Sequence, residues 1–408
     1  MRRTPTDGVP LRVLIVAESF LPAVNGVTNS VVRVARHLRE RGHQPVIVAP
    51  EPGATVLDDI EVVRVPSRAF PLYQGFPVGM PTGGHVEELL DTIDPDVVHL
   101  AAPAVLGARV AKAAAARDLP VVAIFQTDLA GFAQSYHLSS LSPMLWWWLR
   151  RVHRLADVTL APSTATAELV HQHGIPRVGV WPRGVDRELF DPAKRSHAFR
   201  RTVSGDEAGT KPLVGYVGRL AREKHIELLA DLDRRTDLQL VVVGDGPHRD
   251  ELRRALPRAH FTGMLRGEEL AQAVASLDVF VHTGAHETFG QTIQEAMASG
   301  LPVVAPAAGG PLDLVDEGVT GHLVTPGDPE ALVAAVDRVV SDPARRRAYG
   351  LTARARTAQR GWDRLGDDLI DTYRRCCRLR SSGALPPPAP GDTPTSPTTL
   401  DTAAALSA

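Results

Sequence analysis

Two glutamates separated by seven residues, Glu287 and Glu295, are the first candidates for chemistry in the sequence. They lie in the stretch 282–306, which is typical of a strand end, a glycine-containing loop, a short helix and a second buried strand. Gly290 permits a close approach of the backbone, and the first N–H groups of the following helix have no partner within the helix. A carboxylate beside such a helix start suits a ligand that carries both hydroxyl and phosphate groups. Taken alone, the spacing fits equally well with a βαβ corner that carries two solvated glutamates.

A second loop carries two cations. Gly218 and Arg219 follow an expected strand at 213–217, and Lys224 lies five positions after Arg219, just before a helix. A guanidinium offers a planar fork of donors and an ammonium offers a point charge, so the pair could hold two neighbouring phosphates. A solvated basic loop would contain the same residues.

A third loop follows the expected strand at 238–243 and contains Gly244 and Gly246. Glycines at these positions would let the backbone approach a base or a ribose, although tight turns between a strand and a helix use the same residues. All three loops follow strands of one expected sheet, and open α/β sheets bind ligands at the carboxyl ends of their strands. Together the loops predict a phosphate-bearing nucleotide in the second half of the chain, facing a cleft against the first half.

Several other classes of site are disfavoured by missing motifs. No complete G-x-G-x-x-G follows the first strand, which disfavours a dinucleotide-dependent dehydrogenase, and no G-x-x-x-x-G-K-[ST] occurs, which disfavours a P-loop nucleotidase. No cluster of His, Cys and Asp has metal-ligand spacing. We therefore expect neither a metal nor a cofactor.

The elements that must position these loops follow a regular rhythm. Short apolar runs alternate with helical patterns, which predicts an α/β fold of two Rossmann-like, doubly wound parallel-sheet domains. A charged segment from about 182 to 211 interrupts the rhythm and is interpreted as the inter-domain connection. The expected parts are an N-terminal domain at 1–190, a second domain at 191–356, a helix at 357–380 that packs back on the first domain, and a disordered Pro/Thr/Ala-rich tail at 381–408.

The composition of the chain limits the classes of binding partner and the cellular compartment that we expect. The 408-residue chain has a formal net charge of −2, which provides no global attraction to nucleic acid. Its two cysteines, Cys376 and Cys377, are adjacent, so they cannot form a disulfide framework, and we expect a cytoplasmic protein. No apolar run approaches the ~20 residues of a transmembrane helix.

One segment is a candidate for peripheral contact with a membrane. Three consecutive tryptophans, at 146–148, lie beside several basic residues, and this combination suits a lipid headgroup interface. The alternative is a helix that packs its tryptophans into the first domain. Three successive residues cannot all face one side of a helix, so at least one tryptophan is predicted to be partly exposed.

With these motifs in place, the second half of the chain resembles the donor domain of the family 4 glycosyltransferases, which are retaining, nucleotide-sugar-using enzymes of the GT-B fold. The runs that carry this resemblance are VGRLAREK, VGDGP, FTG and ETFGQTIQEAMASGLPVVAP. In the first half the chain resembles more narrowly the actinobacterial GDP-mannose-dependent α-mannosyltransferases that act on glycolipid acceptors. The runs there are AESFLPAVNGVTNSVVRVARHLRERGH, VVHLAAPAVLGARVAKAA, FQTDLAGFAQSYH, LAPSTATAELVHQHGIPRV and WPRGVD, so the resemblance spans roughly residues 11–378.

The resemblance implies a role for each candidate residue. Glu287 would bind hydroxyl groups of the donor sugar, and Glu295 would bind the ribose. Arg219 and Lys224 would neutralise the diphosphate leaving group. The backbone N–H groups of Thr288, Phe289 and Gly290 would help to neutralise the diphosphate, and Gly26 of the first-domain loop would approach it from across the cleft.

The chain departs from the family pattern at one position. Many relatives have a histidine after the strand that here spans 121–125, whereas this chain has Gln126. A glutamine can hydrogen-bond a sugar but cannot take up a proton near neutral pH, so the role of that histidine cannot be transferred. Asp128 could bind or deprotonate the acceptor, or it could cap the loop.

The predicted function is transfer of a hexose, in particular mannose from GDP-mannose, to a hydroxyl group of a lipid or glycolipid acceptor. Three alternatives share the fold: a transferase that uses a UDP-sugar, a sugar-nucleotide epimerase and a non-catalytic nucleotide-sugar binder. The first differs in the nucleotide that it binds. An epimerase would turn over a nucleotide sugar without an acceptor, and a binder would not turn over with any acceptor.

Overall fold

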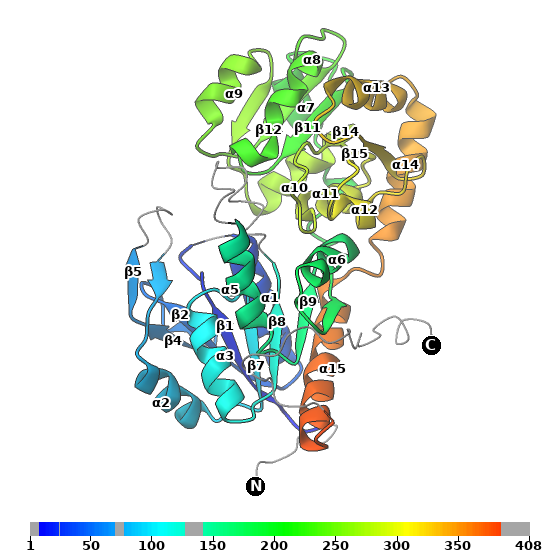
Figure 1. Cartoon of the computed structure of the whole chain (residues 1–408). Helices are drawn as coiled ribbons and strands as arrows, with labels where there is room; N and C mark the ends of the chain where they lie inside the picture. Colours follow the sequence, from blue (N-terminus) through cyan, green and yellow to red (C-terminus); the bar gives the residue numbers. More distant parts are fainter. Residues whose placement is uncertain (1–7, 24, 70–76, 127–141, 385–408) are drawn as a thin grey trace. The chain divides into compact units, whose positions relative to one another are not determined.

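A computed structural model of the chain describes residues 8–23, 25–69, 77–126 and 142–384. These residues form two compact units (Figure 1). The N-terminal unit contains the described residues up to Pro182 together with the segment from Asp363 onward, and the C-terminal unit runs from Arg183 to Trp362. Each unit is built on a parallel sheet of its own.

The N-terminal unit has an eight-stranded sheet in the order β10-β9-β8-β7-β1-β2-β4-β3, in which only the pair β3 and β4 is antiparallel. Its strands are β1 (Arg12–Ala17), β2 (Gln44–Pro50), β3 (Val56–Leu57), β4 (Ile60–Val65), β7 (Val97–Ala101), β8 (Val121–Ile124), β9 (Val158–Ala161) and β10 (Val178–Val180), beside a small hairpin of β5 (Ser67–Ala69) and β6 (Pro77–Gly79). Its helices are α1 (Gly26–Glu40), α2 (Gly83–Ile93), α3 (Leu106–Ala116), α5 (Ser142–His153), α6 (Thr164–Gln172) and α15 (Trp362–Ser381).

The central strands of this sheet are covered on both faces. Leu14 and Val98 pack in one core with Val110 of α3 and Leu90 of α2. The alternate residue Ile15 is also fully buried, and it points to the opposite face because side chains alternate along a strand. Double-sided burial explains why these strands are uninterrupted apolar runs in the sequence.

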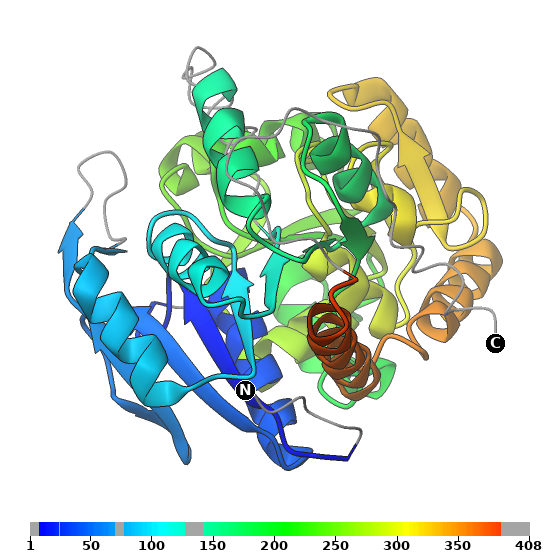
Figure 2. The same ribbon diagram turned by 60° about the horizontal axis from the view of Figure 1, so that its bottom comes forward.

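The last helix, α15, packs on the N-terminal unit (dark red in Figure 2). The hydroxyl of Tyr373 lies 2.6 Å from Nδ1 of His99 on β7, and both side chains are buried. Near the end of α15, the guanidinium of Arg380 donates two hydrogen bonds to the carboxylate of Asp157, at 2.6 and 2.9 Å. The helix is therefore attached by buried polar contacts as well as by apolar packing.

Breaking the Arg380–Asp157 pair is expected to destabilise the N-terminal unit strongly. The two side chains are only 4% and 2% exposed, so Arg380→Ala leaves a buried carboxylate without its partner, at a cost of about 3–5 kcal/mol. The exposed pair of Arg36 and Asp58 provides a matched control, because Arg36→Ala should cost about 0–1 kcal/mol. The measurement is the free energy of unfolding from urea titrations of both variants. Equal losses would contradict a buried, stabilising pair.

The C-terminal unit has a six-stranded parallel sheet in the order β13-β12-β11-β14-β15-β16. Its strands are β11 (Leu213–Val217), β12 (Gln239–Val243), β13 (His260–Gly263), β14 (Val279–Val281), β15 (Val303–Pro306) and β16 (Gly321–Val324). Its α-helices are α7 (His197–Ser204), α8 (Ala230–Asp233), α9 (Arg249–Ala255), α10 (Gly267–Ala275), α11 (Gln291–Ala298), α12 (Pro311–Leu314), α13 (Pro329–Val340) and α14 (Pro343–Arg356). Three short 3₁₀ helices are η2 (Pro192–Lys194), η3 (Arg222–Lys224) and η4 (Ile226–Leu229).

The structure corrects the predicted boundary between the domains. The charged segment interpreted as a connection belongs to the C-terminal unit, and Val185 and Phe190 lie in the core of that unit. Its charges are largely paired: Arg195 and Arg200 donate to the two oxygens of the buried Asp278, at 2.7 and 2.8 Å. The density of charge therefore does not mark a connection between the domains, and the unit begins at Arg183 rather than at 191.

The two ends of the C-terminal unit lie side by side. The N–H of Val185 donates to the carbonyl oxygen of Arg360 at 2.9 Å. A Cβ placed on Gly184 would lie only 2.6 Å from the indole ring of Trp362. The backbone segments at which the chain enters and leaves this unit therefore lie next to each other.

Candidate active site

The strand order of the C-terminal unit reverses between β11 and β14, which are neighbours in the sheet although β12 and β13 separate them in sequence. Crevices at such a reversal are the usual ligand sites of open α/β sheets. The loop after β11 carries Gly218, Arg219 and Lys224, and the loop after β14 carries Glu287. Strand β12 is the other neighbour of β11, so the fold brings together all three loops that the sequence singled out.

Lys224 and Glu287 form an ion pair across these two loops, although 63 positions separate them in sequence. Their side chains are 21% and 18% exposed, so the pair is largely withdrawn from solvent. Burial by itself raises the pKa of Glu287, but the charge of Lys224, together with the neighbouring His282, outweighs this effect and holds that pKa well below its ordinary value. The site therefore presents an ionised carboxylate in contact with the side-chain nitrogen of a lysine.

The loop that carries Glu287 is held in place by a glycine pair that the sequence analysis did not identify. The N–H of Gly310 donates to the carbonyl oxygen of Glu287 at 2.7 Å. A Cβ on Gly309 would collide with that same carbonyl oxygen, and a Cβ on Gly310 would collide with the backbone of Phe289. The dipeptide directly before Pro311 was the available signal, because such close backbone contact requires glycine.

Helix α11 starts immediately after this loop. Gly290 precedes it with φ +96°, a conformation that favours glycine, and Phe289 is buried in the unit's core. Thr288 is half-buried. The three residues therefore form the turn that leads into the helix start, where the first N–H groups have no intrahelical partners.

Glu295 lies on the second turn of α11. Its carboxylate accepts a hydrogen bond from Nε2 of Gln291 at 3.3 Å. Burial raises the pKa of Glu295 to about 7, although the hydrogen bond and the charge of Arg183 act in the opposite direction. The two glutamates therefore differ: Glu287 is ionised at all physiological pH values, and Glu295 titrates near neutrality.

Arg183 was not predicted as a site residue. Burial lowers the pKa of its guanidinium to about 10, while the charges of Glu287 and Glu295 raise it. Nε2 of Gln294 on α11 donates to the carbonyl oxygen of Arg183 at 3.0 Å, which fixes its backbone beside the helix. No motif in the sequence indicated that this residue lies near both glutamates.

The glycines of the loop after β12 are required by packing. A Cβ on Gly244 would collide with the carbonyl oxygen of Gly218, and a Cβ on Gly246 would collide with the backbone of Leu220. The loops after β11 and β12 are thus pressed against each other. This packing accounts for the glycines whether or not a ligand also approaches them.

Arg219 differs from Lys224 in its surroundings. Its side chain is exposed, and within the described residues it makes no hydrogen bond or ion pair. Its carbonyl oxygen accepts a hydrogen bond from the hydroxyl of Tyr216 at 3.2 Å. An unpaired guanidinium beside the strand reversal is available to an anionic ligand.

Comparison with known proteins identifies the class of site. Residues 24–189 match the model "Glycosyltransferase Family 4", and residues 202–356 match "Glycosyl transferases group 1". The chain is 52% identical to a GDP-mannose-dependent alpha-mannosyltransferase of Mycolicibacterium smegmatis, over 91% of this chain and 99% of that protein. The chain belongs to the family 4 glycosyltransferases.

Two further similarities fit this assignment. The family 4 chain is 35% identical to the sulfoquinovosyl transferase SQD2 of Arabidopsis thaliana, over 86% of this chain and 71% of that protein. Its fold matches the solved sucrose-phosphate synthase of Thermosynechococcus elongatus with a TM-score of 0.73 and 21% identity, over 89% of this chain and 98% of the other. The predicted GT-B fold is thereby confirmed.

The predicted residues of the N-terminal unit are placed as follows. Gly26 is exposed as the first residue of α1, and the side chain of Asn25 caps that helix by accepting from two backbone N–H groups at 2.9 Å. Gln126 is buried just after β8. Asp128 lies outside the described residues, so its role stays a prediction.

The tryptophans of this glycosyltransferase divide between packing and exposure. Trp146 is buried and stacks on His173 with ring centroids 3.7 Å apart, and the indole N–H of Trp148 donates to a backbone carbonyl at 2.9 Å. Trp147 is 52% exposed, with the guanidinium of Arg151 lying 5.8 Å from its ring centroid. Met144, three positions before Trp147 on α5, is also exposed. Trp146 and Trp148 therefore pack as the second alternative expects, and Trp147 is partly exposed as predicted, while contact with a membrane stays a prediction.

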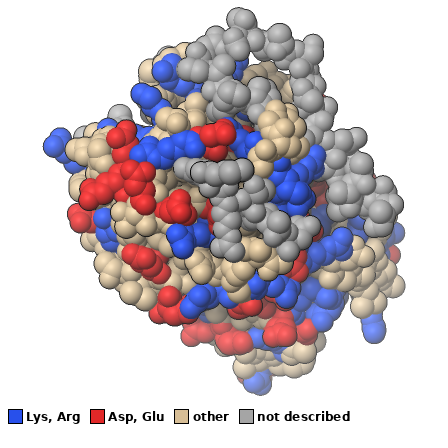
Figure 3. Space-filling model, turned by 90° about the horizontal axis from the view of Figure 1, so that it is seen from below, with Lys and Arg blue, Asp and Glu red and all other residues tan. Residues whose placement is uncertain are grey.

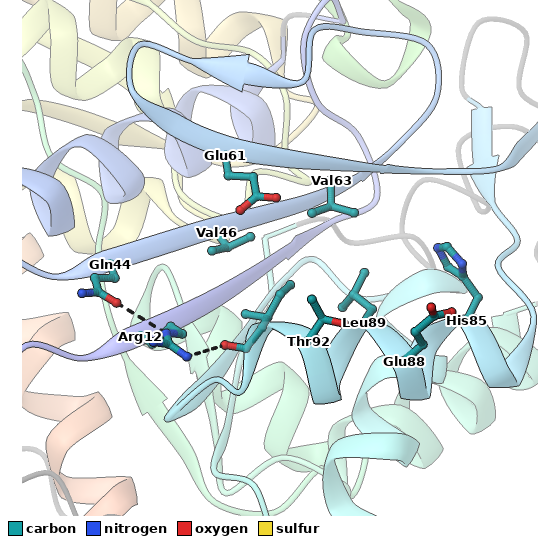
Figure 4. A pocket seen from close by; sticks show the side chains of 10 residues that line it. Arg12, Gln44, Val46, Glu61, Val63, His85, Glu88, Leu89 and Thr92 are labelled. Atoms are coloured by element: carbon teal, nitrogen blue, oxygen red, sulfur yellow. Dashed lines mark hydrogen bonds between the residues drawn. The ribbon is translucent and has the colours of Figure 1, made fainter.

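The N-terminal unit contains a groove (Figure 4). Its volume is about 610 Å³, and it runs between α2 and the strands β2 and β4. Val46 and Val63 line one wall and Leu89 the other, while Arg12 donates to the carbonyl oxygen of Ile93 at 2.8 Å at one end. Arg12 begins β1, so this end of the groove lies near the amino ends of the strands rather than at the carboxyl ends, where α/β enzymes bind substrates.

Three other features of the described residues do not indicate a further binding site. His37, Glu40 and Asp363 form the one group with metal-ligand spacing in the described part of the chain, and Nε2 of His37 already lies 2.8 Å from Asp367. Basic and acidic side chains are intermingled over the face in Figure 3, so neither sign dominates there. Among the described helices, none is long and apolar enough to span a membrane.

Proposed function

We propose that this chain transfers mannose from GDP-mannose, with retention of anomeric configuration, to a hydroxyl group of a lipid or glycolipid acceptor. The observation that carries the donor assignment is the 52% identity to a GDP-mannose-dependent alpha-mannosyltransferase across nearly its full length. The partly buried Lys224–Glu287 pair at the strand reversal supplies the chemistry. Glu287 accepts hydrogen bonds from mannose hydroxyls, and Lys224 binds the diphosphate together with Arg219.

The charges of the site suit the reaction. Cleavage of the bond between the sugar and the phosphate places positive charge on the anomeric carbon and negative charge on the departing diphosphate. Cations that are fixed before the reaction stabilise the departing charge without reorganisation. The N–H groups of residues 288–290 and the start of α11 add to this stabilisation. Gly26 is proposed to approach the same diphosphate, and Asp128 to act on the acceptor hydroxyl, a role that Gln126 cannot fill because it does not titrate.

Calorimetric titration with GDP, UDP and ADP tests the donor assignment. We expect GDP to bind at least tenfold more tightly than the other two. Tighter binding of UDP would overturn the mannose proposal but not the family. A donor sugar other than mannose has support of its own, because the chain is also 35% identical to a sulfoquinovosyl transferase, whose name specifies a different sugar.

The acceptor is tested by transfer of radiolabelled mannose from GDP-mannose into organic-extractable product. Reactions contain total polar lipid, water-soluble sugars or no acceptor. We expect label in the lipid fraction only. Label in the soluble sugars would contradict a lipid acceptor, and release of free mannose alone would indicate hydrolysis. Conversion of the nucleotide sugar without any acceptor would instead favour an epimerase.

Contact with the membrane is proposed to occur through Trp147 and its neighbours Met144 and Arg151 on α5. An exposed indole beside a guanidinium suits the interface between headgroups and acyl chains. We predict that Trp147→Ser weakens binding to vesicles containing anionic lipid several-fold and leaves GDP affinity unchanged. Vesicle co-sedimentation measures this effect, with the exposed Leu351→Ser of the C-terminal unit as control. Equal binding by both variants would rule out this face.

Donor binding is predicted to depend on the protonation of Glu295. Ribose hydroxyls donate to an ionised carboxylate, and burial raises the pKa of Glu295 to about 7 in the free enzyme. As the pH falls below 7, the protonated fraction rises, so the dissociation constant for GDP should increase toward about tenfold per pH unit. In Glu295→Gln this dependence should disappear. Calorimetry between pH 5.5 and 8.5 provides the measurement, and an unchanged slope in the variant would contradict the assignment.

A further inference from the structure

A buried histidine lies beside the proposed sugar-binding carboxylate and has no role in the mechanism above. His282 directly follows β14 and is only 2% exposed. Its backbone N–H donates to the carbonyl oxygen of Val304 at 2.8 Å, and its ring lies nearly parallel to that of Tyr216, with an interplanar angle of 15°. Both the backbone and the ring of His282 are therefore held in place.

Both ring nitrogens of His282 lack a hydrogen-bond partner within the described residues. Buried polar atoms are nearly always satisfied, and leaving one unsatisfied costs about 1–3 kcal/mol. Nε2 points to a definite neighbour, because it lies 3.5 Å from Oε1 of Glu287. That distance exceeds a hydrogen bond by about 0.5 Å.

The same oxygen of Glu287 is occupied by Lys224. In the proposed reaction Lys224 binds the diphosphate, so it must leave the carboxylate at least in part. A largely buried carboxylate that loses its ammonium would lose its direct ion-pair partner, which is strongly unfavourable. A second hydrogen-bond donor that already faces Oε1 would remove this difficulty.

We propose that His282 is a positioning residue whose Nε2–H takes over the carboxylate of Glu287 when a nucleoside diphosphate draws Lys224 to its phosphates. The inference rests on the proposed function of the site and adds an exchange of partners to it. The carboxylate stays ionised and oriented toward the sugar while the ammonium moves to the leaving group. A shift of a few tenths of an ångström converts the contact of 3.5 Å into a hydrogen bond.

A double-mutant cycle tests this exchange. The dissociation constant of GDP is measured by calorimetry for the wild type, H282L, E287Q and the double variant. In H282L no hydrogen-bond donor replaces Lys224 at the carboxylate of Glu287, so GDP should bind at least tenfold more weakly. In the E287Q background there is no carboxylate charge to compensate, so adding H282L should change the affinity less than twofold. Equal losses in both backgrounds would show a merely structural role and overturn the proposal.

The conservative variant H282Q provides a second readout. Its amide offers an N–H near the position of Nε2, so GDP affinity should return to within about threefold of the wild type. Failure of H282Q to restore affinity, in a variant whose melting temperature matches the wild type, would also overturn the proposal. The wild-type arm separately tests the proposed donor: if UDP or ADP binds in place of GDP, the donor assignment fails, and the cycle is run with the nucleotide that binds.

Discussion

Replacing Lys224 with alanine is expected to lower the rate of mannosyl transfer by about 10²- to 10³-fold, which is the usual effect of removing one group that stabilises developing negative charge. The ammonium lies beside Glu287 in the free enzyme and is proposed to bind the diphosphate before the sugar departs, when the leaving group gains charge. The loss should appear in kcat, measured under saturating GDP-mannose. A lysine of the same unit, Lys194, serves as the control because it is also ion-paired, with Glu268 at 2.6 Å, in a different part of the fold.

Lys194→Ala should change kcat less than twofold. The two variants remove the same charge from the same unit, so general electrostatic effects cancel in the comparison. A Lys224→Ala enzyme that transfers mannose within twofold of the wild-type rate would refute the assignment of this residue to the leaving group. Circular dichroism and thermal unfolding establish that each variant is folded.

Replacing Glu287 with alanine is expected to reduce transfer by a similar factor, about 10²- to 10³-fold, but to affect the nucleotide differently. Glu287 is proposed to contact the mannose of the donor, which GDP lacks. Removing it also releases Lys224 from its ion pair, so the affinity for GDP should be unchanged or higher. This opposite behaviour of transfer and GDP binding is specific to a residue that serves the sugar.

The measurements are kcat for mannosyl transfer and the dissociation constant of GDP for Glu287→Ala and Glu287→Gln. The glutamine variant retains the shape but not the charge and should lie between the alanine variant and the wild type. Glu251→Gln, at an exposed ion-paired glutamate of α9, is the control. If GDP binding weakens as much as transfer does, Glu287 binds the nucleotide and not the sugar.

The sequence predicted most of the elements that hold the site, because the strands are buried on both faces and appear as unbroken apolar runs. The position of Glu287 just before a short helix, and of Glu295 within it, follows from local signals such as Gly290. The pairing of Glu287 with Lys224 could not be read in the same way. It depends on β11 and β14 becoming neighbours, which is a property of the strand order.

The residues that sequence reasoning missed share one physical cause. His282, Gly309 and Gly310 matter because of what packs against them, and a neighbour distant in sequence leaves no local pattern. The charged segment before β11 misled for the reverse reason, since Arg200 resembles a solvated residue until Asp278 is placed beside it. Local periodicity therefore determines elements, and tertiary pairing determines which charges are buried.

The adjacency of Gly184 and Trp362 at the two ends of the C-terminal unit has a consequence for protein engineering. A segment whose ends nearly meet is joined to the rest of the chain as an insertion, and such segments tolerate excision, transplantation and circular permutation. Residues 183–362 could therefore be replaced by the corresponding segment of another family 4 enzyme, joined at the same two positions, to change the donor preference. A chimaera of this kind would separate the choice of nucleotide sugar from the choice of acceptor.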